Sequence, residues 1–369
     1  MDYLEKYKKF DKKTAVQKFT VTMNIRGGDG GSDNIICIGD DVVYKIIPYH
    51  IKNPNSKYRF EGDQDEIKLY KKLTKDFILS DKTPHIVGYY CNYKTDITNL
   101  FKGLPSVNEV YMKKSEKIEQ QLVTLRFNYQ SGVIKKNADV ITIEKCPLTI
   151  SIYIEKNLNK IESILHRIIF QIIYTLAVIQ KKYPSFVHND LFLRNVLAVE
   201  EKSYGADDYV EYKFNNRKFY LKANGLYVKI NDFGYSLESK YFLDKRGKNV
   251  ANFRLGKMPN VNCKKCDIFN FLHDLYDGAN MGGKSVKSIL KKNKKCKKGK
   301  IIDKVFKTYL DIKTINAINK NNRRLLNKTW SLYHLPFLQK CVEEPSQYLS
   351  KITFKKPKKC NIIKYYKGT

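Results

Sequence analysis

The feature that most constrains the fold is a set of apolar residues at helical spacing in the middle of the chain. Isoleucine and leucine recur at steps of three and four residues, at Ile161, Leu165, Ile168, Ile172, Leu176 and Ile179. This spacing puts them on one face of a helix of about five turns. Polar Gln171 and Thr175 interrupt the run, which therefore stays shorter than the ~20 apolar residues that span a bilayer. The pattern predicts a long helix buried in a helical domain.

The N-terminal part of the chain has the patterns of strands instead. Apolar and polar side chains alternate from 18 to 25, which is the period of a half-buried strand. Two short apolar runs, 35–38 and 42–47, follow and are separated by a Gly39-Asp40-Asp41 turn. The further predicted elements are a helix at 65–73, a loop entering a strand at 84–90, an insertion near 92–137 and a strand at 139–144.

The C-terminal part is predicted to be mainly helical after Cys146-Pro147. Apolar residues that alternate on both sides of Asn215-Asn216 predict a β-hairpin over 209–221, in an insertion near 200–225. The stretch 284–300 holds nine lysines in seventeen positions, so it is expected to be a solvated basic loop. Helical patterning resumes at 301–337.

The 369 residues are enough for two parts, each with a core of its own. We expect an α+β architecture with a small β-rich N-lobe, 1–145, and a larger helical C-lobe, 146–369. Eight dispersed cysteines argue against a disulfide framework, and the Cys263-x-x-Cys266 pair lacks the second pair typical of zinc sites. Because Met1 to Phe10 is charged and aromatic, no secretory signal is expected, and the protein is expected to be intracellular.

The charge is strongly positive, since 69 lysines and arginines face 37 acids, giving a formal net charge of +32. Such a balance predicts attraction to phosphate-rich or acidic partners that weakens with salt. An alternative stays open, because Lys, Ile, Asn and Tyr are abundant together and a coding sequence rich in A and T would give the same excess. The basic runs carry no interleaved aromatic residues on a recognisable motif, so nucleic acid is expected only as a non-specific electrostatic partner.

Two short motifs carry the clearest chemical information. The segment after the long helix contains His188-Asn189-Asp190-Leu191 and then Asn195, in the form H-x-D-L-x-x-x-N. Asp232-Phe233-Gly234 follows, with Asp232 thirty-seven positions beyond Asn195. Each residue alone could be a turn cap or a strand end. Their joint order and spacing resemble those of the catalytic and metal-binding loops of kinases.

The two motifs resemble those of the protein-kinase-like superfamily, and upstream residues extend the resemblance. The matching positions are Gly28, Gly30, Gly31 and Ile35 in the glycine-rich turn, Lys45 on the following strand, Glu66 on the helix, and Ile143, Glu144 and Cys146 in the hinge. The chain is most similar to divergent serine/threonine kinases of large DNA viruses, over residues 19–276. A viral source would place it in the host cytoplasm or the virion.

The resemblance implies a bilobal protein-kinase-like fold that transfers a phosphoryl group from ATP, with magnesium, to protein hydroxyls, expected to be Ser or Thr. The glycine-rich turn would bring backbone N–H groups close to the phosphates, and Lys45, oriented by Glu66, would contact the α and β phosphates. The backbone of Glu144 and Cys146 would bond adenine.

The same resemblance assigns roles in the second half of the chain. Asn195 and Asp232 would be the magnesium ligands, because carboxylate and amide oxygens suit that ion. Asp190 would be the catalytic residue at the attacking hydroxyl. Arg194 is a further catalytic candidate, because tyrosine kinases carry arginine there. His188 and Asp267 are expected to support the loop.

Some positions depart from the family pattern. Asp33 stands at the third glycine of the turn, Asn189 replaces the arginine usual before the catalytic aspartate, and Phe192 replaces a lysine. Because H-N-D-L also occurs in choline-kinase-like and aminoglycoside-kinase-like enzymes, a small-molecule kinase is the alternative function. A catalytically silent kinase-like scaffold is another. The matches at Lys45 and Glu66 favour protein substrates, acidic ones given the charge.

Overall fold

The computed structural model describes residues 7, 10, 35–51, 62–101, 117–234, 236, 263–276, 284–293, 299–311 and 342–368. The chain divides into two compact units. Unit 1 consists of Met1–Thr74 and Val87–Lys145, and unit 2 of Lys75–Ile86 and Cys146–Thr369. The strand predicted at 18–25 lies outside the described residues. Strands dominate unit 1 and helices unit 2, so the predicted α+β class is confirmed.

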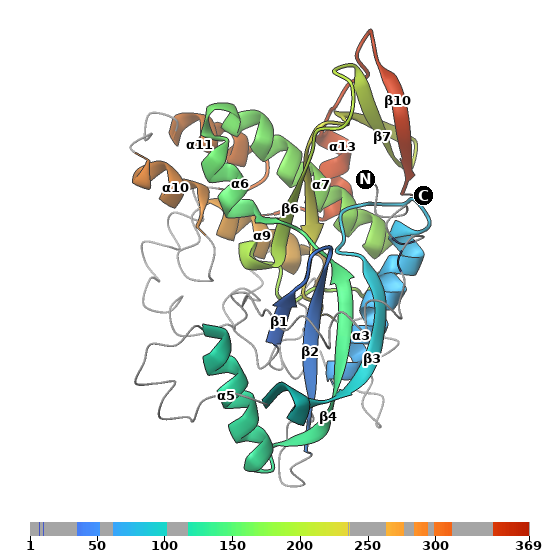
Figure 1. Ribbon diagram of the computed structural model, residues 1–369. Helices are drawn as coiled ribbons and strands as arrows, with labels where there is room; N and C mark the ends of the chain where they lie inside the picture. The colour runs from blue at the N-terminus through green and yellow to red at the C-terminus, as the bar shows by residue number, and fades with distance from the viewer. Residues whose placement is uncertain are drawn as a thin grey trace. The chain divides into compact units, whose positions relative to one another are not determined.

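Unit 1 is built on a four-stranded antiparallel sheet in the order β1-β2-β4-β3 (Figure 1). Its strands are β1 (Ile35–Ile38), β2 (Val42–His50), β3 (Tyr89–Asp96) and β4 (Ile134–Glu144). The runs at 35–38 and 42–47 are therefore confirmed as strands. The region expected as an insertion, 92–137, contributes to the sheet at both of its ends. Sequence pattern missed the start of β4 because exposed Lys135, Lys136 and Asn137 hide the alternation.

The helices of unit 1 lie beside this sheet. Helix α3 (Gly62–Leu73) confirms the helix predicted at 65–73 and packs against β2 and β3. A π-helical turn, Thr74–Ile78, continues it. Between β3 and β4 lie a 3-10 turn, Ile97–Phe101, and helix α5 (Lys117–Gln130), which packs against β4 and β1.

Helix α7 (Ile161–Lys182) forms the core of unit 2 and confirms the long buried helix. Sixteen of its side chains are buried, so its neighbours cover more than the one predicted face. The polar residues inside it are bonded: Gln171 donates to the Leu226 carbonyl at 2.9 Å and accepts the Val228 N–H at 2.8 Å, and Thr175 bonds Thr83. In the described part of the chain, Leu158–Lys182 is the one stretch long and apolar enough to cross a membrane, and 78% of its most apolar window is buried inside the protein.

Two three-stranded sheets flank α7. The first has the order β5-β6-β9 and comprises β5 (Leu148–Thr149), β6 (Val196–Glu201) and β9 (Gly225–Ile230). The second has the order β10-β7-β8 and comprises β7 (Asp208–Phe214), β8 (Arg217–Lys222) and β10 (Asn361–Lys367). Strands β7 and β8 pair around Asn215-Asn216, which confirms the predicted hairpin. Strand β10 pairs parallel to β7 and was not predicted.

The remaining helices of unit 2 are α6 (Ile150–Lys156), a 3-10 turn Leu158–Lys160, α9 (Cys263–Tyr276), α10 (Val286–Lys292), α11 (Gly299–Lys307) and α13 (Pro345–Lys351). Helix α10 corrects the expectation of a basic loop over 284–300. Its lysines hide an apolar face made by Val286, Ile289 and Leu290, all buried, and Ser285 caps its first turn. Helix α11 begins the helical region predicted at 301–337, and 312–341 lie outside the described residues.

Candidate active site

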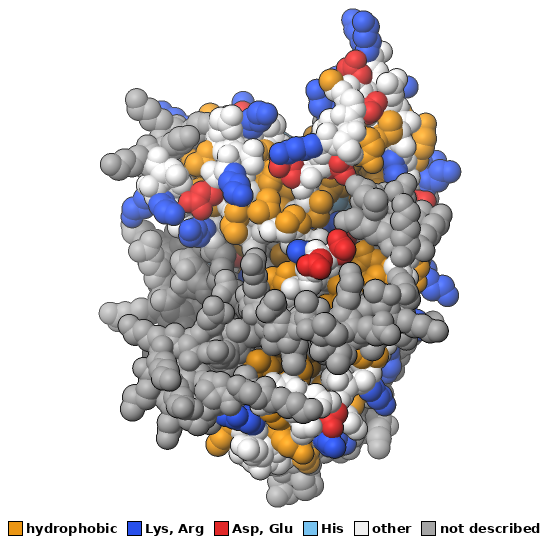
Figure 2. All heavy atoms as spheres, viewed as in Figure 1, with side chains coloured by type: hydrophobic (Ala, Val, Ile, Leu, Met, Phe, Trp, Pro, Cys, Tyr) orange, Lys and Arg blue, Asp and Glu red, His pale blue; other side chains and the backbone are white. Residues whose placement is uncertain are grey.

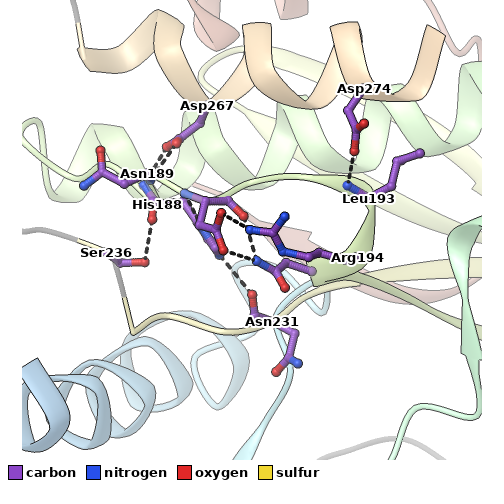
Figure 3. A network of polar contacts seen from close by, with 10 residues as sticks. His188, Asn189, Leu193, Arg194, Asn231, Ser236, Asp267 and Asp274 are labelled. Atoms are coloured by element: carbon purple, nitrogen blue, oxygen red, sulfur yellow. Dashed lines mark hydrogen bonds and ion pairs between the residues drawn. The ribbon is translucent and has the colours of Figure 1, made fainter. Parts of the chain in front are cut away.

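The loop between α7 and β6 holds the first motif, and a buried carboxylate fixes its backbone. Asp267 of α9 accepts the N–H of His188 at 2.7 Å with one oxygen and the N–H of Asn189 at 2.9 Å with the other (Figure 3). Both bonds come from one rigid helix, so they set the direction in which the loop leaves α7. Asn189 has a φ of 64°, a left-handed conformation that asparagine tolerates better than most residues. The predicted supporting role of Asp267 fits this geometry.

Asp190 lies at the centre of the loop, and the residue as a whole is 2% exposed. Its Oδ1 accepts from the Arg194 guanidinium at 2.5 Å, and its Oδ2 accepts from Asn195 Nδ2 at 2.7 Å. Asn195 Nδ2 also donates to the Asp190 carbonyl at 2.8 Å. The loop therefore brings together three of the predicted site residues and orients both oxygens of the central carboxylate (Figure 3).

The second motif lies next to this loop. The Asn231 N–H donates to the Asn195 carbonyl at 2.9 Å, so the backbone that leads into Asp232 runs directly beside Asn195. Asp232 has a φ of 63°, which turns the chain sharply after β9. Asn195 and Asp232, the predicted metal ligands, thus come from adjacent backbone segments.

His188 joins the two segments. Its Nε2 lies 3.0 Å from the Asn231 carbonyl oxygen, which can only accept, so Nε2 donates and Nδ1 is left to accept the Asp190 N–H at 3.3 Å. The ring also contacts Phe233, with 5.2 Å between centroids. His188 is completely buried, and these contacts give it a supporting position, as expected from the sequence.

Three further residues of this network were not singled out as site residues from the sequence. Asp274 of α9 accepts the Leu193 N–H at 2.8 Å, Ser236 Oγ donates to the His188 carbonyl at 3.2 Å, and Asn231 receives the His188 bond (Figure 3). Asp274 had a detectable signal: it follows Asp267 by two helical turns, so both lie on the same face of α9.

Burial sets the protonation behaviour of the two supporting carboxyl groups. It raises the pKa of Asp267 to about 6, although His188 and the two N–H donors act in the opposite direction. It also raises the pKa of Asp274 to about 6, against the N–H of Leu193 and the charge of Arg194. A carboxylate is the better partner for two backbone donors, because it only accepts. Above about pH 6 both groups are carboxylates, at a cost in stability that their raised pKa values express.

Unit 1 holds the other predicted site residues. Lys45 of β2 and Glu66 of α3 form an ion pair with 2.6 Å between Nζ and Oε1, and each residue is only 3% exposed. Ile35 opens β1, is buried and pairs with Ile46. Glu144 exchanges two bonds with Gly88: its N–H donates to the Gly88 carbonyl, and its side chain accepts the Gly88 N–H.

The remaining predicted site residues are Cys146 and three glycines. Cys146 begins the second part of unit 2, is partly exposed and forms no disulfide with another described residue. Gly28, Gly30 and Gly31 lie outside the described residues.

Comparison with known proteins gives a direct relationship. No protein-family model matches the chain. A protein of Acanthamoeba polyphaga mimivirus is 34% identical over 376 residues, which cover 92% of this chain and 91% of that protein. Its name describes a serine/threonine-protein kinase and marks this activity as inferred. A second mimivirus protein with the same description is 28% identical over 175 residues, 46% of this chain and 36% of that protein.

A structural comparison adds a kinase domain solved by crystallography. It is 14% identical in sequence, covers 88% of this chain and 92% of its own, and gives a TM-score of 0.35. That score is too low to support an argument about the fold. The relationship to the first mimivirus protein rests on sequence, over 92% of this chain.

Proposed function

This chain belongs to the protein-kinase-like superfamily, and we propose that it transfers the γ-phosphoryl group of ATP, with magnesium, to serine and threonine hydroxyls of proteins. The observation that carries the proposal is the orientation of the Asp190 carboxylate between Arg194 and Asn195. Phosphoryl transfer has a loose transition state, so the main task of the protein is to place the reactants and to offset charge. A loop that is bonded at nearly every residue suits that task.

Asp190 is proposed to orient the attacking hydroxyl and to accept its proton. Arg194 cannot take this proton, because a guanidinium stays protonated in proteins. We therefore assign Arg194 a positioning role through its ion pair with Asp190, rather than the direct catalytic role that its place in the motif suggested. The Arg194 side chain is 25% exposed and that of Asp190 only 3%, so Arg194 is the member of the pair that can move when a substrate binds.

The donor atoms next to Asp190 fit magnesium. Asn195 uses its Nδ2 on Asp190, and its Oδ1 accepts no hydrogen bond from the described residues, so a hard amide oxygen remains for a cation. Asp232 adds a carboxylate from the adjacent segment. Magnesium held by these two residues would neutralise charge on the phosphate oxygens.

The ion pair of unit 1 fits the nucleotide in the same proposal. Lys45 is buried on β2, an inner strand of the sheet, and Glu66 holds its ammonium group by a short charge-assisted hydrogen bond. A lysine fixed in this way presents one defined positive charge, which suits the α and β phosphates. Glu144 and Cys146 are proposed to bond adenine through their backbone.

The test is a transfer assay with radiolabelled ATP and magnesium on casein, histone, choline and an aminoglycoside, followed by phosphoamino-acid analysis. We expect label on serine and threonine of casein above histone, because the chain carries +32 charges and casein is acidic. Asp190→Asn should lower turnover by about a hundredfold or more while nucleotide binding persists. Asp207→Asn, a change of an exposed aspartate, is the matched control.

Other outcomes would overturn the proposal. Transfer to choline or the aminoglycoside without label on protein would make the chain a small-molecule kinase. The presence of Asn189 favours this alternative, because H-N-D-L also occurs in such enzymes. Thermal stabilisation by nucleotide without turnover on any acceptor would identify a silent scaffold. Asp190→Asn with normal turnover would show that the catalytic loop is assigned wrongly.

A further inference from the structure

The β10-β7-β8 sheet of unit 2 has two faces of opposite character. Its inner face packs on α7 through aromatic rings: Tyr212 lies 5.1 Å from Tyr174, Phe219 lies 5.2 Å from Phe170, and Tyr366 lies 5.2 Å from Tyr212, between ring centroids. These side chains are at most 6% exposed. The inner face is therefore part of the core.

The outer face follows from strand alternation, since successive side chains point to opposite faces. Tyr212 points inward, so Glu211 points outward, and the register pairs Glu211 with Tyr220 of β8 and Tyr365 of β10. Tyr209, two residues before Glu211, shares this face. Three tyrosines thus surround Glu211, with backbones roughly 5–7 Å from its own, set by the distances between and along strands.

Tyr365 is the most exposed of these rings. Its exposed fraction is 52%, against 6% for its neighbour Tyr366, which confirms that the two side chains lie on opposite faces. Tyr209 and Tyr220 are half-buried. The outer face therefore exposes flat aromatic rings to solvent, and the packing of the inner face on α7 fixes the position of the sheet that carries them.

Basic residues frame these rings. The segments 208–222 and 352–367 contain ten lysines and arginines and two acids. Lys222 and Lys367, at two corners of the outer face, are exposed, and so are Lys355, Lys356, Lys358 and Lys359 in the connection to β10. Figure 2 shows lysine and arginine side chains together with hydrophobic and some acidic ones over β7 and β10.

The single acid on the face is neutralised. Glu211 is 7% exposed and pairs with Lys218 at 3.0 Å. Burial, and then the hydrogen bond to Glu211, raise the pKa of Tyr220, which ties this ring to the pair. Glu211 therefore fixes the side chains of Lys218 and Tyr220, and its charge is balanced by Lys218, so it does not repel an anionic ligand.

We propose that the outer face of the β10-β7-β8 sheet binds single-stranded nucleic acid, with Tyr365, Tyr220 and Tyr209 stacking on bases and the surrounding lysines contacting phosphates. Exposed rings on a basic surface are the combination by which proteins hold single strands without reading sequence. The proposal is independent of the catalytic site and changes the expectation drawn from the sequence. In the sequence, Tyr209 and Tyr220 lie in one segment and Tyr365 in a distant one, and strand pairing brings the three rings together.

An acidic polypeptide is the alternative ligand, because it too would pair with the lysines, but its carboxylate side chains would not stack on the exposed tyrosine rings. Stacking needs a flat π-system, and every base offers one, whereas aspartate and glutamate side chains do not. Duplex DNA would satisfy the lysines yet keeps its bases stacked on each other. The exposed tyrosines therefore favour a single strand over both.

The test measures binding of the full chain to fluorescent oligothymidylate and oligouridylate by anisotropy, at low and at physiological salt. We expect binding that weakens about tenfold over this salt range. Lys222→Glu with Lys367→Glu should weaken it about tenfold, and Tyr365→Ala with Tyr220→Ala by a similar factor, while the two Tyr→Phe changes keep it. The preferred oligomer distinguishes RNA from DNA as the natural ligand.

Matched controls lie elsewhere on the chain. Lys300→Glu with Lys304→Glu makes the same charge change on α11, and Phe127→Ala removes a ring that is 56% exposed on α5. Both should leave binding within about twofold. Equal loss in the α11 variant, or full binding by the Tyr→Ala variant, would overturn the proposal. So would polyglutamate that binds as tightly as the oligonucleotide and depends on the same lysines. Casein phosphorylation by each variant verifies that it is folded.

Discussion

The proposed catalytic loop, residues 188–195, and the β10-β7-β8 sheet are held in place mainly by different kinds of interaction. In the loop, buried polar groups bond backbone N–H groups, as Asp267 does for His188 and Asn189. At the sheet, burial dominates: Tyr212 packs on Phe170 of α7, and the hydrogen bond from its hydroxyl to His85 is added at the edge of the ring. Hydrogen bonds depend steeply on angle and distance, whereas apolar burial depends mainly on area. The loop is therefore built for placement, and the inner face of the sheet for stability.

The largest expected effect tests the sheet side of this comparison. Phe170→Ala removes a completely buried ring that contacts Tyr174, Tyr212, Phe219 and Phe354. It should lower the free energy of unfolding by about 3–5 kcal/mol, from lost burial and the cavity left behind. Urea unfolding measures this. Phe127→Ala on the surface should cost less than about 0.5 kcal/mol, and folded Phe170→Ala protein should keep its turnover per molecule.

The next effect tests the loop. Asp267→Ala leaves two buried N–H groups without their acceptor, at about 1–3 kcal/mol each, partly offset because a buried carboxylate is removed. We expect turnover to fall about a hundredfold, or about 2.7 kcal/mol, with a smaller change in unfolding free energy. Asp267→Asn keeps one acceptor oxygen and should lie between. If Asp267→Ala lowered stability as much as Phe170→Ala and left turnover intact, the distinction between the two regions would be wrong.

The comparison extends to pH, beginning with the loop. The pKa of Asp267 is about 6 in the folded protein and near 3.8 when unfolded. Between these values the folded state binds the extra proton, so this group's stabilisation is complete below pH 4 and is lost as pH rises to 6. Asp267→Asn should therefore gain stability relative to the parent over this range, by at most about 1.4 kcal/mol per pH unit. Urea midpoints at pH 4, 5 and 6 decide it.

A histidine at the sheet should show the opposite dependence. His85 donates Nδ1–H to the Val228 carbonyl and accepts from the Tyr212 hydroxyl, both at 3.0 Å, and burial followed by the charge of Lys229 lowers its pKa. The unfolded state then takes up the proton first, so stability is lost as pH falls below about 6.5. His85→Gln should flatten this acid branch. An unchanged slope between pH 6.5 and 5 would mean that another group controls it.

Local features of the fold could be predicted from the sequence, and distant pairings could not. The periodicity of α7 and the turn at Asn215-Asn216 are local, so both were found. The function of Gln171 inside α7 was not, because its partners, Leu226 and Val228, lie on β9. Strand β10 was missed for the same reason, since its hydrogen bonds are to β7, a segment about 150 positions earlier in the chain.

The site shows the same division. Motif order identified the residues Asp190, Asn195 and Asp232 as a group, because their spacing is a property of the chain. The ion pair from Arg194 to Asp190 and the bond from Ser236 to His188 depend on how the loop folds back. The sequence therefore predicts which residues lie together in the loop, whereas the contact from Arg194 to Asp190 is seen only in the structure.

The smallest expected effect concerns regulation of the loop. Many kinases hold a phosphate on the segment after the second motif with the arginine that precedes the catalytic aspartate, and Asn189 occupies that place here. Ser236, on that segment, is 3% exposed and donates its Oγ proton to the His188 carbonyl. Phosphorylation of Ser236 would remove this hydrogen bond and bring negative charge toward the buried Asp267. We therefore expect the loop to be ordered without a phosphate on Ser236.

Phosphatase treatment should leave the initial rate within about twofold, and Ser236→Ala should lower turnover less than about tenfold, since one neutral bond is worth about 0.5–1.5 kcal/mol. A tenfold loss on phosphatase treatment, with Ser236→Ala equally impaired, would instead make phosphorylated Ser236 the element that orders the loop.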